Sequence, residues 1–180
     1  MRVIAGIARG HPLVAPRDRG TRPITDRVKE TLFAILGERV PDARVLDLYA
    51  GSGAIGIEAL SRGAASATFV EHARPALVAL RTNLERTHLA DFAVIQPIEV
   101  DRFLGAAGGG RWDLAFFDPP YEVRAIVAPL RAVEPLLAPD AMVVVKHFWR
   151  TEVPEVAGLQ PVRQRRFGET MLSFLEATGR

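Results

Sequence analysis

The stretch RVLDLYAGSGAIG, residues 44–56, determines the fold expected for this chain of 180 residues. Its first five residues are mostly apolar and suit a buried strand, and Gly51, Gly53 and Gly56 follow where the chain must turn sharply into a helix. The first turn of that helix presents backbone N–H groups that have no partner within the helix. The pattern therefore predicts a ligand-binding loop between a strand and a helix.

Short apolar runs like the first recur four times further along the chain, at 67–71, 93–96, 114–117 and 142–146. Their apolar residues are continuous, as in parallel strands that are buried on both faces. Helices are expected between them at 55–62 and 74–87, and 105–111 is expected to be a flexible loop. Residues 159–167 and 170–176 suit an antiparallel hairpin. We therefore predict an α/β fold with a doubly wound, mostly parallel sheet.

The N-terminal part differs from this middle. Residues 2–15 suit a small hairpin, and 16–24 form a loop rich in proline, glycine and arginine. Thr25 or Asp26 can then cap a helix whose apolar face continues from Val28. We predict two parts, a basic N-terminal arm over 1–24 and a main domain over 25–180.

Charge is distributed unevenly along the chain. Residues 1–40 carry eight Lys or Arg against four Asp or Glu, 41–160 carry eleven against fifteen, and 161–180 carry four against two. Arginine supplies 21 of the 23 basic residues, and guanidinium groups suit phosphate contacts and base stacking. The basic ends favour a nucleic-acid substrate over a solvated basic loop, and the candidate contacts in the arm are Arg2, Arg9, Arg17, Arg19 and Arg22.

Composition excludes several other classes of protein. The chain is 48% hydrophobic and 24% charged, which is typical of a globular protein. It has no cysteine, so disulfides and thiolate metal sites are excluded, and its four histidines lack the spacing of metal ligands. No apolar run approaches the roughly 20 residues that a membrane helix needs. We expect a cytoplasmic, monomeric protein without a metal ion or a membrane partner.

The glycine loop is compatible with two classes of cofactor. The spacing of Gly51, Gly53 and Gly56 is that of a dinucleotide-binding fingerprint, and Glu71 stands 20 residues after Gly51 at a strand end. A nicotinamide or flavin oxidoreductase is therefore an alternative. However, Asp47 places a carboxylate at the mouth of the loop, which repels a pyrophosphate and attracts the ammonium group of a methionine-type ligand. The sequence thus favours S-adenosylmethionine, with S-adenosylhomocysteine as the product.

The fourth strand ends in the tetrapeptide Asp118-Pro119-Pro120-Tyr121. In open α/β sheets the carboxyl ends of the strands form the ligand site, so this motif is expected to face the glycine loop. Asp118 and the Pro119 carbonyl can accept both N–H groups of a primary amine on a base, and Pro120 stiffens the turn. Tyr121 offers a flat face for the base. The motif therefore predicts methyl transfer to an exocyclic amine, with these four residues as the catalytic set.

The acceptor itself stays open at this point. Adenine N6, cytosine N4 and a protein glutamine amide all carry the same planar amine. A non-catalytic ribosome-assembly factor that binds the cofactor or RNA without turnover is the alternative from another class. Asp118 and Tyr121 argue against it, since a binding module has no evident need for them.

Four motifs together resemble one family, the RsmD-type 16S rRNA guanine-N2 methyltransferases. They are RPITDRVKETLF at 22–33, DLYAGSGAIGIEAL at 47–60, DPPY at 118–121 and RFGET at 166–170. The resemblance implies a class I methyltransferase fold with a seven-stranded sheet. It also implies one guanine of 16S rRNA as the target, in the 30S subunit or its assembly intermediate.

The resemblance also assigns roles to individual residues. Glu71 would bind the ribose and Glu99 would lie near the adenine amine. Two positions depart from the family pattern: Ile24 replaces a more usual Thr, and Lys146 stands where relatives often have Glu, so we assign Lys146 no role. The methionine part of the cofactor would be held by Asp47, Gly51, Ser52 and Gly53, with Tyr49 of the same loop also at the cofactor. The substrate side would be organised by Arg22, Thr25, Asp26 and Arg27.

Overall fold

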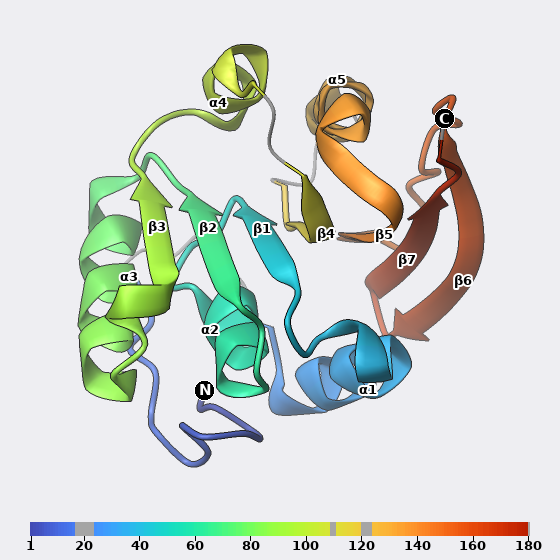
Figure 1. Cartoon of the computed structure of the whole chain (residues 1–180). Coiled ribbons are helices and arrows are strands. Elements are labelled where there is room, and N and C mark those ends of the chain that lie inside the picture. The colour runs from blue at the N-terminus through green and yellow to red at the C-terminus, as the bar shows by residue number, and fades with distance from the viewer. Residues whose placement is uncertain (17–23, 109–110, 120–123, 180) are drawn as a thin grey trace.

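The structure is a computed structural model, and it describes residues 1–16, 24–108, 111–119 and 124–179. Helices and strands alternate along most of the chain (Figure 1). The helices are α1 (Asp26–Leu36), α2 (Ala54–Ser61), α3 (Arg74–Thr87), α4 (Val100–Ala106) and α5 (Arg124–Val133), with 3-10 turns η1 (Gly37–Arg39), η2 (Ala90–Phe92) and η3 (Glu134–Leu136). The strands are β1 (Arg44–Leu48), β2 (Ser66–Val70), β3 (Ala93–Gln96), β4 (Trp112–Phe117), β5 (Leu137–Phe148), β6 (Leu159–Phe167) and β7 (Thr170–Ala177).

The seven strands form one sheet in the order β3-β2-β1-β4-β5-β7-β6. The first five strands in this order are parallel, and β7 pairs antiparallel with both β5 and β6. In the register, Leu48 lies opposite Val70 and Phe117, and Phe117 lies opposite Val145. The carboxyl ends of β1, β2, β4 and β5 therefore meet at one edge of the sheet. The expected doubly wound, mostly parallel seven-stranded sheet with an antiparallel C-terminal hairpin is confirmed.

Helices cover both faces of the sheet (Figure 1). One core cluster joins α1, α2, α3 and the N-terminal segment to strand residues such as Val45 and Phe116. The other joins α4 and α5 to strand residues such as Leu46 and Phe117. Successive strand residues thus alternate between the two cores, as pleated strands require. Within the ranges that the structure describes, no helix is long and apolar enough to cross a membrane.

Local signals at the helix ends act as expected. Thr25 caps α1, since its hydroxyl oxygen accepts a hydrogen bond from the Val28 N–H at 3.4 Å. Pro75 lies in the first turn of α3, whose leucine stripe is buried. The N-terminal segment also pairs with itself, because Arg2 forms an antiparallel bridge with Pro12. The predicted cap and hairpin are therefore confirmed, although the hairpin contains a single bridge instead of two strands.

Three differences from the sequence-based expectation concern the second half of the chain. Neither α4 nor α5 is among the helices expected from the sequence, and α4 continues to Ala106, within the range where we expect a loop. Both helices are hard to recognise because α4 has only seven residues and no side-chain cap, and α5 contains Pro129. Strand β5 is also longer than expected, since Leu137 already pairs with Trp112 across an irregular register.

Candidate active site

The glycine loop connects the end of β1 to the start of α2. Tyr49, Gly51 and Gly53 all have positive φ, at 60°, 56° and 77°. The Gly53 N–H donates to the Ala50 carbonyl at 2.8 Å, which closes the turn. A Cβ atom on Gly53 would lie 2.4 Å from Leu80 Cδ1, so only glycine fits both the backbone conformation and the space. The loop is therefore tight and held against α3.

Asp47 lies beneath this loop and not at its mouth, where we expect it from the sequence. It belongs to the face of β1 that packs toward α2, and it is only 2% exposed. Its Oδ2 accepts a hydrogen bond from the Gly56 N–H at 3.0 Å. Desolvation by burial raises the pKa of Asp47 to about 8, and the nearby charges of Asp118 and Glu71 add to the effect. In the protein without a ligand, this carboxyl group is therefore largely protonated at neutral pH.

Glu71 follows β2 and is tied to the glycine loop. One of its oxygens accepts a hydrogen bond from the Gly51 N–H at 2.9 Å, and the other accepts from the N–H groups of His72 and Ala73, both at 2.8 Å. Glu99 lies close by, with its Oε2 3.4 Å from the His72 Nδ1 and its side chain 65% exposed. The structure thus brings Glu71 and Glu99, both predicted to bind the cofactor, to the same place.

Asp118 follows β4 and forms an ion pair with Lys146 of the neighbouring strand β5. The Lys146 Nζ lies 2.8 Å from Oδ1 and 2.7 Å from Oδ2, so it contacts both carboxylate oxygens. The backbone N–H of Asp118 donates to the Leu48 carbonyl at 3.4 Å, which joins the motif to the end of β1. Burial raises the pKa of Asp118, and the charge and hydrogen bonds of Lys146 counteract this rise.

The charged residues at this edge share one face of the sheet. Val45 and Val144 belong to the core beneath α1, α2 and α3, so Asp47 and Lys146, two positions further along β1 and β5, lie on the same face. Asp118 contacts Lys146 there, and Asp118 and Glu71 lie close enough to Asp47 to raise its pKa. We call Asp47, Glu71 and Asp118 the carboxylate cluster. It is strongly anionic when ionised, and Lys146 contacts it through Asp118.

The remaining residues of the two predicted sets are placed as follows. Tyr49 is half-buried, and burial raises the pKa of its hydroxyl to about 12, with smaller contributions from Asp101 and Glu99. Ser52 is buried, and Pro119 is buried directly after Asp118. Pro120 and Tyr121 of the acceptor motif lie outside the described residues.

Of the residues predicted for the substrate side, those that the structure describes make no hydrogen bond or ion pair with the carboxylate cluster. Arg2 pairs with Asp26 through its Nε at 3.3 Å, while Arg9 and Arg27 are exposed. The Ile7 N–H bonds to the Ser61 carbonyl, so the hairpin that carries Arg9 lies by the end of α2 that is farther from the glycine loop. The other predicted contacts, Arg17, Arg19 and Arg22, lie outside the described residues.

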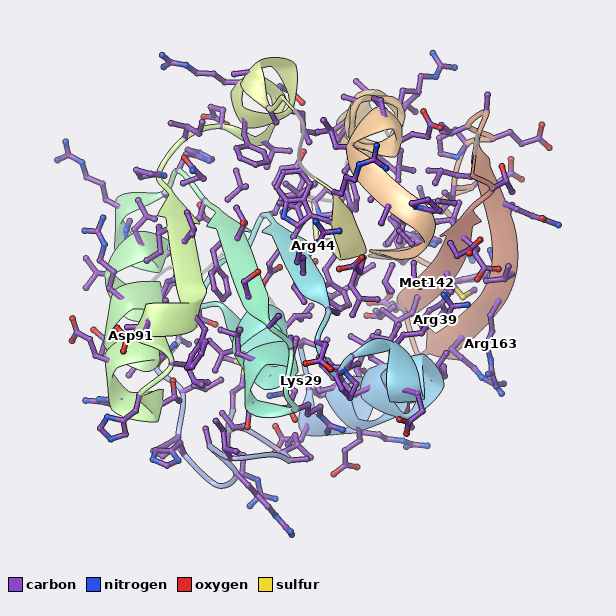
Figure 2. The ribbon with its side chains drawn as sticks, in the orientation of Figure 1. Lys29, Arg39, Arg44, Asp91, Met142 and Arg163 are labelled. Carbon is purple, nitrogen blue, oxygen red and sulfur yellow. The ribbon has the colours of Figure 1, made fainter. Side chains whose placement is uncertain are left out.

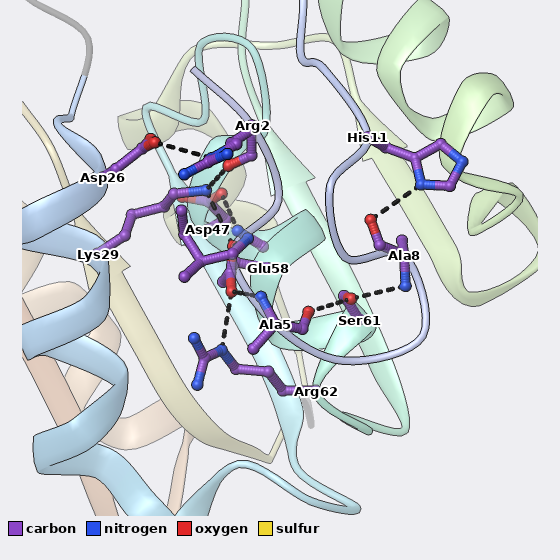
Figure 3. Close-up of polar contacts among 12 residues, drawn as sticks. Arg2, Ala5, Ala8, His11, Asp26, Lys29, Asp47, Glu58, Ser61 and Arg62 are labelled. Atoms are coloured by element: carbon purple, nitrogen blue, oxygen red, sulfur yellow. Dashed lines mark hydrogen bonds and ion pairs between the residues drawn. The ribbon is translucent and has the colours of Figure 1, made fainter.

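A buried polar network that the sequence analysis misses fixes the N-terminal segment (Figure 3). The Glu58 carboxylate accepts hydrogen bonds from the N–H groups of Ile4 and Ala5, and it pairs with Lys29 at 2.9 Å and Arg62 at 2.9 Å. Lys29 and Glu58 are both fully buried, and Lys29 lies between α1 and α2 (Figure 2). The signal was present in the sequence, because each is a lone charge on an apolar helix face.

Asn83 of α3 is a second missed residue, and it touches the glycine loop. Its side-chain amide donates to the carbonyls of Ser52 and Val14, both at 2.9 Å, and its oxygen accepts from the Val14 N–H at 2.7 Å. The N-terminal segment and the glycine loop therefore share one buried side chain. No motif marks Asn83 in the sequence, since its partners are backbone groups far along the chain.

The fold is that of a methyltransferase. A solved structure described as "Putative methyltransferase yhhF from Escherichia coli" superposes with a TM-score of 0.89 at 34% identity, covering 100% of this chain and 99% of that one. An RNA methyltransferase from Salinibacter ruber, solved with S-adenosyl-L-homocysteine, shares the fold with a TM-score of 0.69 at 16% identity, covering 88% of this chain and 95% of that one.

Sequence comparison also identifies the family of this chain. The model of the family described as conserved hypothetical protein 95 matches residues 1–176, and the chain belongs to this family, the RsmD family. It is 37% identical to ribosomal RNA small subunit methyltransferase D of Escherichia coli (strain K12) over 87% of this chain and 79% of that protein. It is 35% identical to the Bacillus subtilis (strain 168) protein named "Putative rRNA methyltransferase YlbH" over 99% of this chain and 100% of that protein.

Proposed function

We propose that this protein transfers a methyl group from S-adenosylmethionine to the exocyclic N2 of a guanine in 16S rRNA of the small ribosomal subunit. The observation that carries the proposal is the shared position of Asp118 and the glycine loop, at one edge and on one face of the sheet. A bound cofactor and an acceptor amine held by Asp118 would meet there. The names of the relatives, which are rRNA methyltransferases, support RNA as the substrate.

The carboxylate cluster fits this cofactor better than it fits a dinucleotide. When bound, S-adenosylmethionine supplies an activated methyl group on a positively charged sulfur, and it also carries an ammonium group. Three carboxylates attract both cations, whereas they would repel a pyrophosphate. Ionising the buried Asp47 costs free energy, and a cation placed above the loop favours its ionised form. Glu71, which now accepts from the Gly51 N–H, is the candidate to bind the ribose hydroxyls.

On the acceptor side, Asp118 and the Pro119 carbonyl would accept the two N–H groups of the guanine amine. These bonds turn the nitrogen lone pair toward the methyl group and fix the distance between the reactants. Such positioning can supply roughly 7–11 kcal/mol of the barrier. Tyr121 would stack on the base with about 1–3 kcal/mol, which helps to offset the few kcal/mol needed to take a guanine out of its stack. The carboxylate of Asp118 can also accept the proton that the methylated amine releases.

The arginines of the N-terminal arm are the proposed phosphate contacts. They lie away from the carboxylate cluster where the structure describes them, so their role would be to anchor RNA at a distance from the reacting base. Anchoring of this kind supplies affinity that depends on salt and carries no sequence preference. The choice of the base then depends on the acceptor motif.

The test is transfer of a labelled methyl group to 30S particles, naked 16S rRNA and duplex DNA, followed by nucleoside analysis of the labelled product. We expect label in N2-methylguanine on 16S rRNA, in the 30S particle or an assembly intermediate. Label on N6-methyladenine, on N4-methylcytosine or on protein would identify another acceptor. If the protein binds the cofactor and RNA but transfers no label to any substrate, it is a binding factor and the proposal is wrong.

A further inference from the structure

We propose that Lys146 is a positioning residue for Asp118. The lysine holds the Asp118 carboxylate ionised and fixed from the buried side, while the substrate binds from the open side. This inference rests on the proposed function, because it takes Asp118 as the group that accepts the amine. Neither the acceptor motif nor the glycine loop contains Lys146, which enters the site only through the pairing of β4 with β5.

The geometry of the pair sets the direction of approach. Lys146 Nζ is 2.8 Å and 2.7 Å from the two oxygens of Asp118, so the carboxylate cannot rotate without losing one of these contacts. The side chain of Lys146 is 11% exposed and that of Asp118 is 33% exposed. Lys146 therefore approaches from the interior, and the outward side of the carboxylate remains accessible.

Lys146 does not occupy all of the accepting capacity of Asp118. An ionised carboxylate has about four lone-pair sites, and the ammonium group uses one on each oxygen. Each oxygen can still accept a further N–H group from the outward side. The guanine amine and Lys146 can therefore bind Asp118 at the same time, and the lysine need not leave before the substrate enters.

The backbone around Lys146 is well placed to hold the pair in position. Val145 lies opposite Phe117, and Lys146 lies opposite Leu172 of β7, so β5 is paired on both sides at this level. A strand in the middle of a sheet moves little compared with a loop. Lys146 is thus held rigidly by the sheet and keeps the carboxylate of Asp118, just beyond the end of β4, in place.

The charges around Asp118 explain why a cation is needed there. Asp47 of β1 and Glu71 after β2 lie on the same face, and both are acidic. Lys146 is the basic group that contacts Asp118 itself, while the His72 ring lies 3.8 Å from Glu71. Burial favours a protonated Asp118, which could donate but would accept amine hydrogens poorly. Lys146 favours the ionised form, because an adjacent cation lowers the pKa of a carboxyl group.

The variants Lys146→Met, Lys146→Gln and Lys146→Arg test the proposal. We expect the pH profile of single-turnover methyl transfer to shift to higher pH in Lys146→Met and Lys146→Gln. At pH 6 the rate should fall ~10-fold or more below wild type, and the difference should narrow by pH 9, since one pKa unit changes the ionised fraction ~10-fold. Lys146→Arg keeps the cation and should keep the wild-type profile. Cofactor affinity should change much less than the rate at pH 6.

A readout that needs no activity is the titration of the Asp118 side-chain carbon by NMR, with carbon-13 in the aspartates. Its midpoint should lie at higher pH in Lys146→Met or Lys146→Gln than in wild type. The matched control is Arg44→Met. It breaks the exposed ion pair of Arg44 with Asp113, which lies at the amino ends of β1 and β4, away from Asp118, and should move neither readout.

The possible outcomes separate the two proposals. If both neutral variants lose rate equally at every pH and the Asp118 titration is unchanged, Lys146 is only structural and the inference is wrong. A neutral variant that is faster than wild type at every pH would also overturn it, since Lys146 would then compete with the amine. If wild type transfers no label to any RNA, the proposed function fails, while the NMR titration still decides whether Lys146 controls the charge of Asp118.

Discussion

The substitution Asp47→Asn changes the charge beneath the glycine loop and leaves its shape almost unchanged. Asp47 is 2% exposed, and its Oδ2 accepts the hydrogen bond from the Gly56 N–H at 3.0 Å. The side-chain oxygen of asparagine can accept the same bond, and the two side chains have nearly equal volumes. We therefore expect a folded variant that differs from wild type by one titratable proton.

The effect of this proton on stability has a definite sign. Burial, with smaller contributions from Asp118 and Glu71, raises the pKa of Asp47 from 3.8 to about 8. Between these pH values the folded chain keeps a proton that the unfolded chain has lost, so the free energy of unfolding falls as the pH rises. At ~1.4 kcal/mol for each pKa unit, the loss in wild type is on the order of 5 kcal/mol by pH 9. The variant lacks this loss.

Urea denaturation of both proteins without cofactor at pH 5, 7 and 9 measures the difference. Between pH 5 and pH 9 the variant should gain about 4 kcal/mol in stability relative to wild type, since about three pKa units separate pH 5 from the pKa of about 8, at ~1.4 kcal/mol each. Binding of S-adenosylmethionine, measured by calorimetry, should change in the opposite direction. Wild type should bind it more tightly as the pH rises from 7 to 9, whereas the variant should bind it more weakly and without this pH dependence.

The control is Asp113→Asn on the far edge of the sheet. Partial burial raises the pKa of Asp113, but the hydrogen bonds and charge of Arg44 outweigh this and lower it. Its contribution to stability is therefore present at neutral pH and is lost as the pH falls through its lowered pKa, which is the reverse of Asp47. If wild type and Asp47→Asn lose stability equally between pH 5 and 9, Asp47 does not titrate there and the reasoning about the carboxylate cluster is wrong.

Three further predictions concern the acceptor, the N-terminal network and the RNA contacts. Asp118→Ala should abolish methyl transfer to 30S particles and leave cofactor affinity within the same order of magnitude; a comparable loss of cofactor binding would mean that Asp118 supports the cofactor site instead. Lys29→Met leaves the buried carboxylate of Glu58 without its main counterion, so urea denaturation should show a loss of about 3–5 kcal/mol; a loss below ~1 kcal/mol would show that the backbone N–H groups and Arg62 suffice. Neutralising three arginines of the N-terminal arm should weaken RNA binding and flatten its dependence on salt while cofactor affinity stays unchanged; an equal loss of cofactor affinity would make the arm a folding element.

The parallel half of the sheet could be predicted because its sequence signals are local. Continuous apolar runs mark β1 and β3 with the bounds that the structure shows, and Pro75 and the leucine stripe mark α3. The seven-residue α4 gives no comparable signal, since it spans only about two turns and has no capping side chain. Helix α5 contains Pro129, which the sequence rules count against a helix interior.

The candidate site, like the fold, could be predicted from the sequence only in part. The glycine loop and Asp118 follow strand ends, so the sequence could place them at one edge of the sheet. The ion pair of Asp118 with Lys146 could not be predicted, because it depends on which strands are neighbours and on their register. The depth of Asp47 depends likewise on how closely α2 packs on β1, and the position of Gly56 against Phe69 sets that packing. Residue type and spacing contain neither kind of information.

The hydrogen bonds that hold the N-terminal segment also constrain the order in which the chain can fold during synthesis. Ile4, Ala5 and Ala8 bond to Glu58 and Ser61, which lie 53 or 54 positions later, and Val14 bonds to Asn83, 69 positions later. During synthesis these residues must therefore wait until α2 and α3 have emerged before their backbone groups find partners. Contacts so distant in sequence form late, after the loops between them have closed. A newly made chain thus completes the glycine loop and fixes the segment up to Val14 in the same late step.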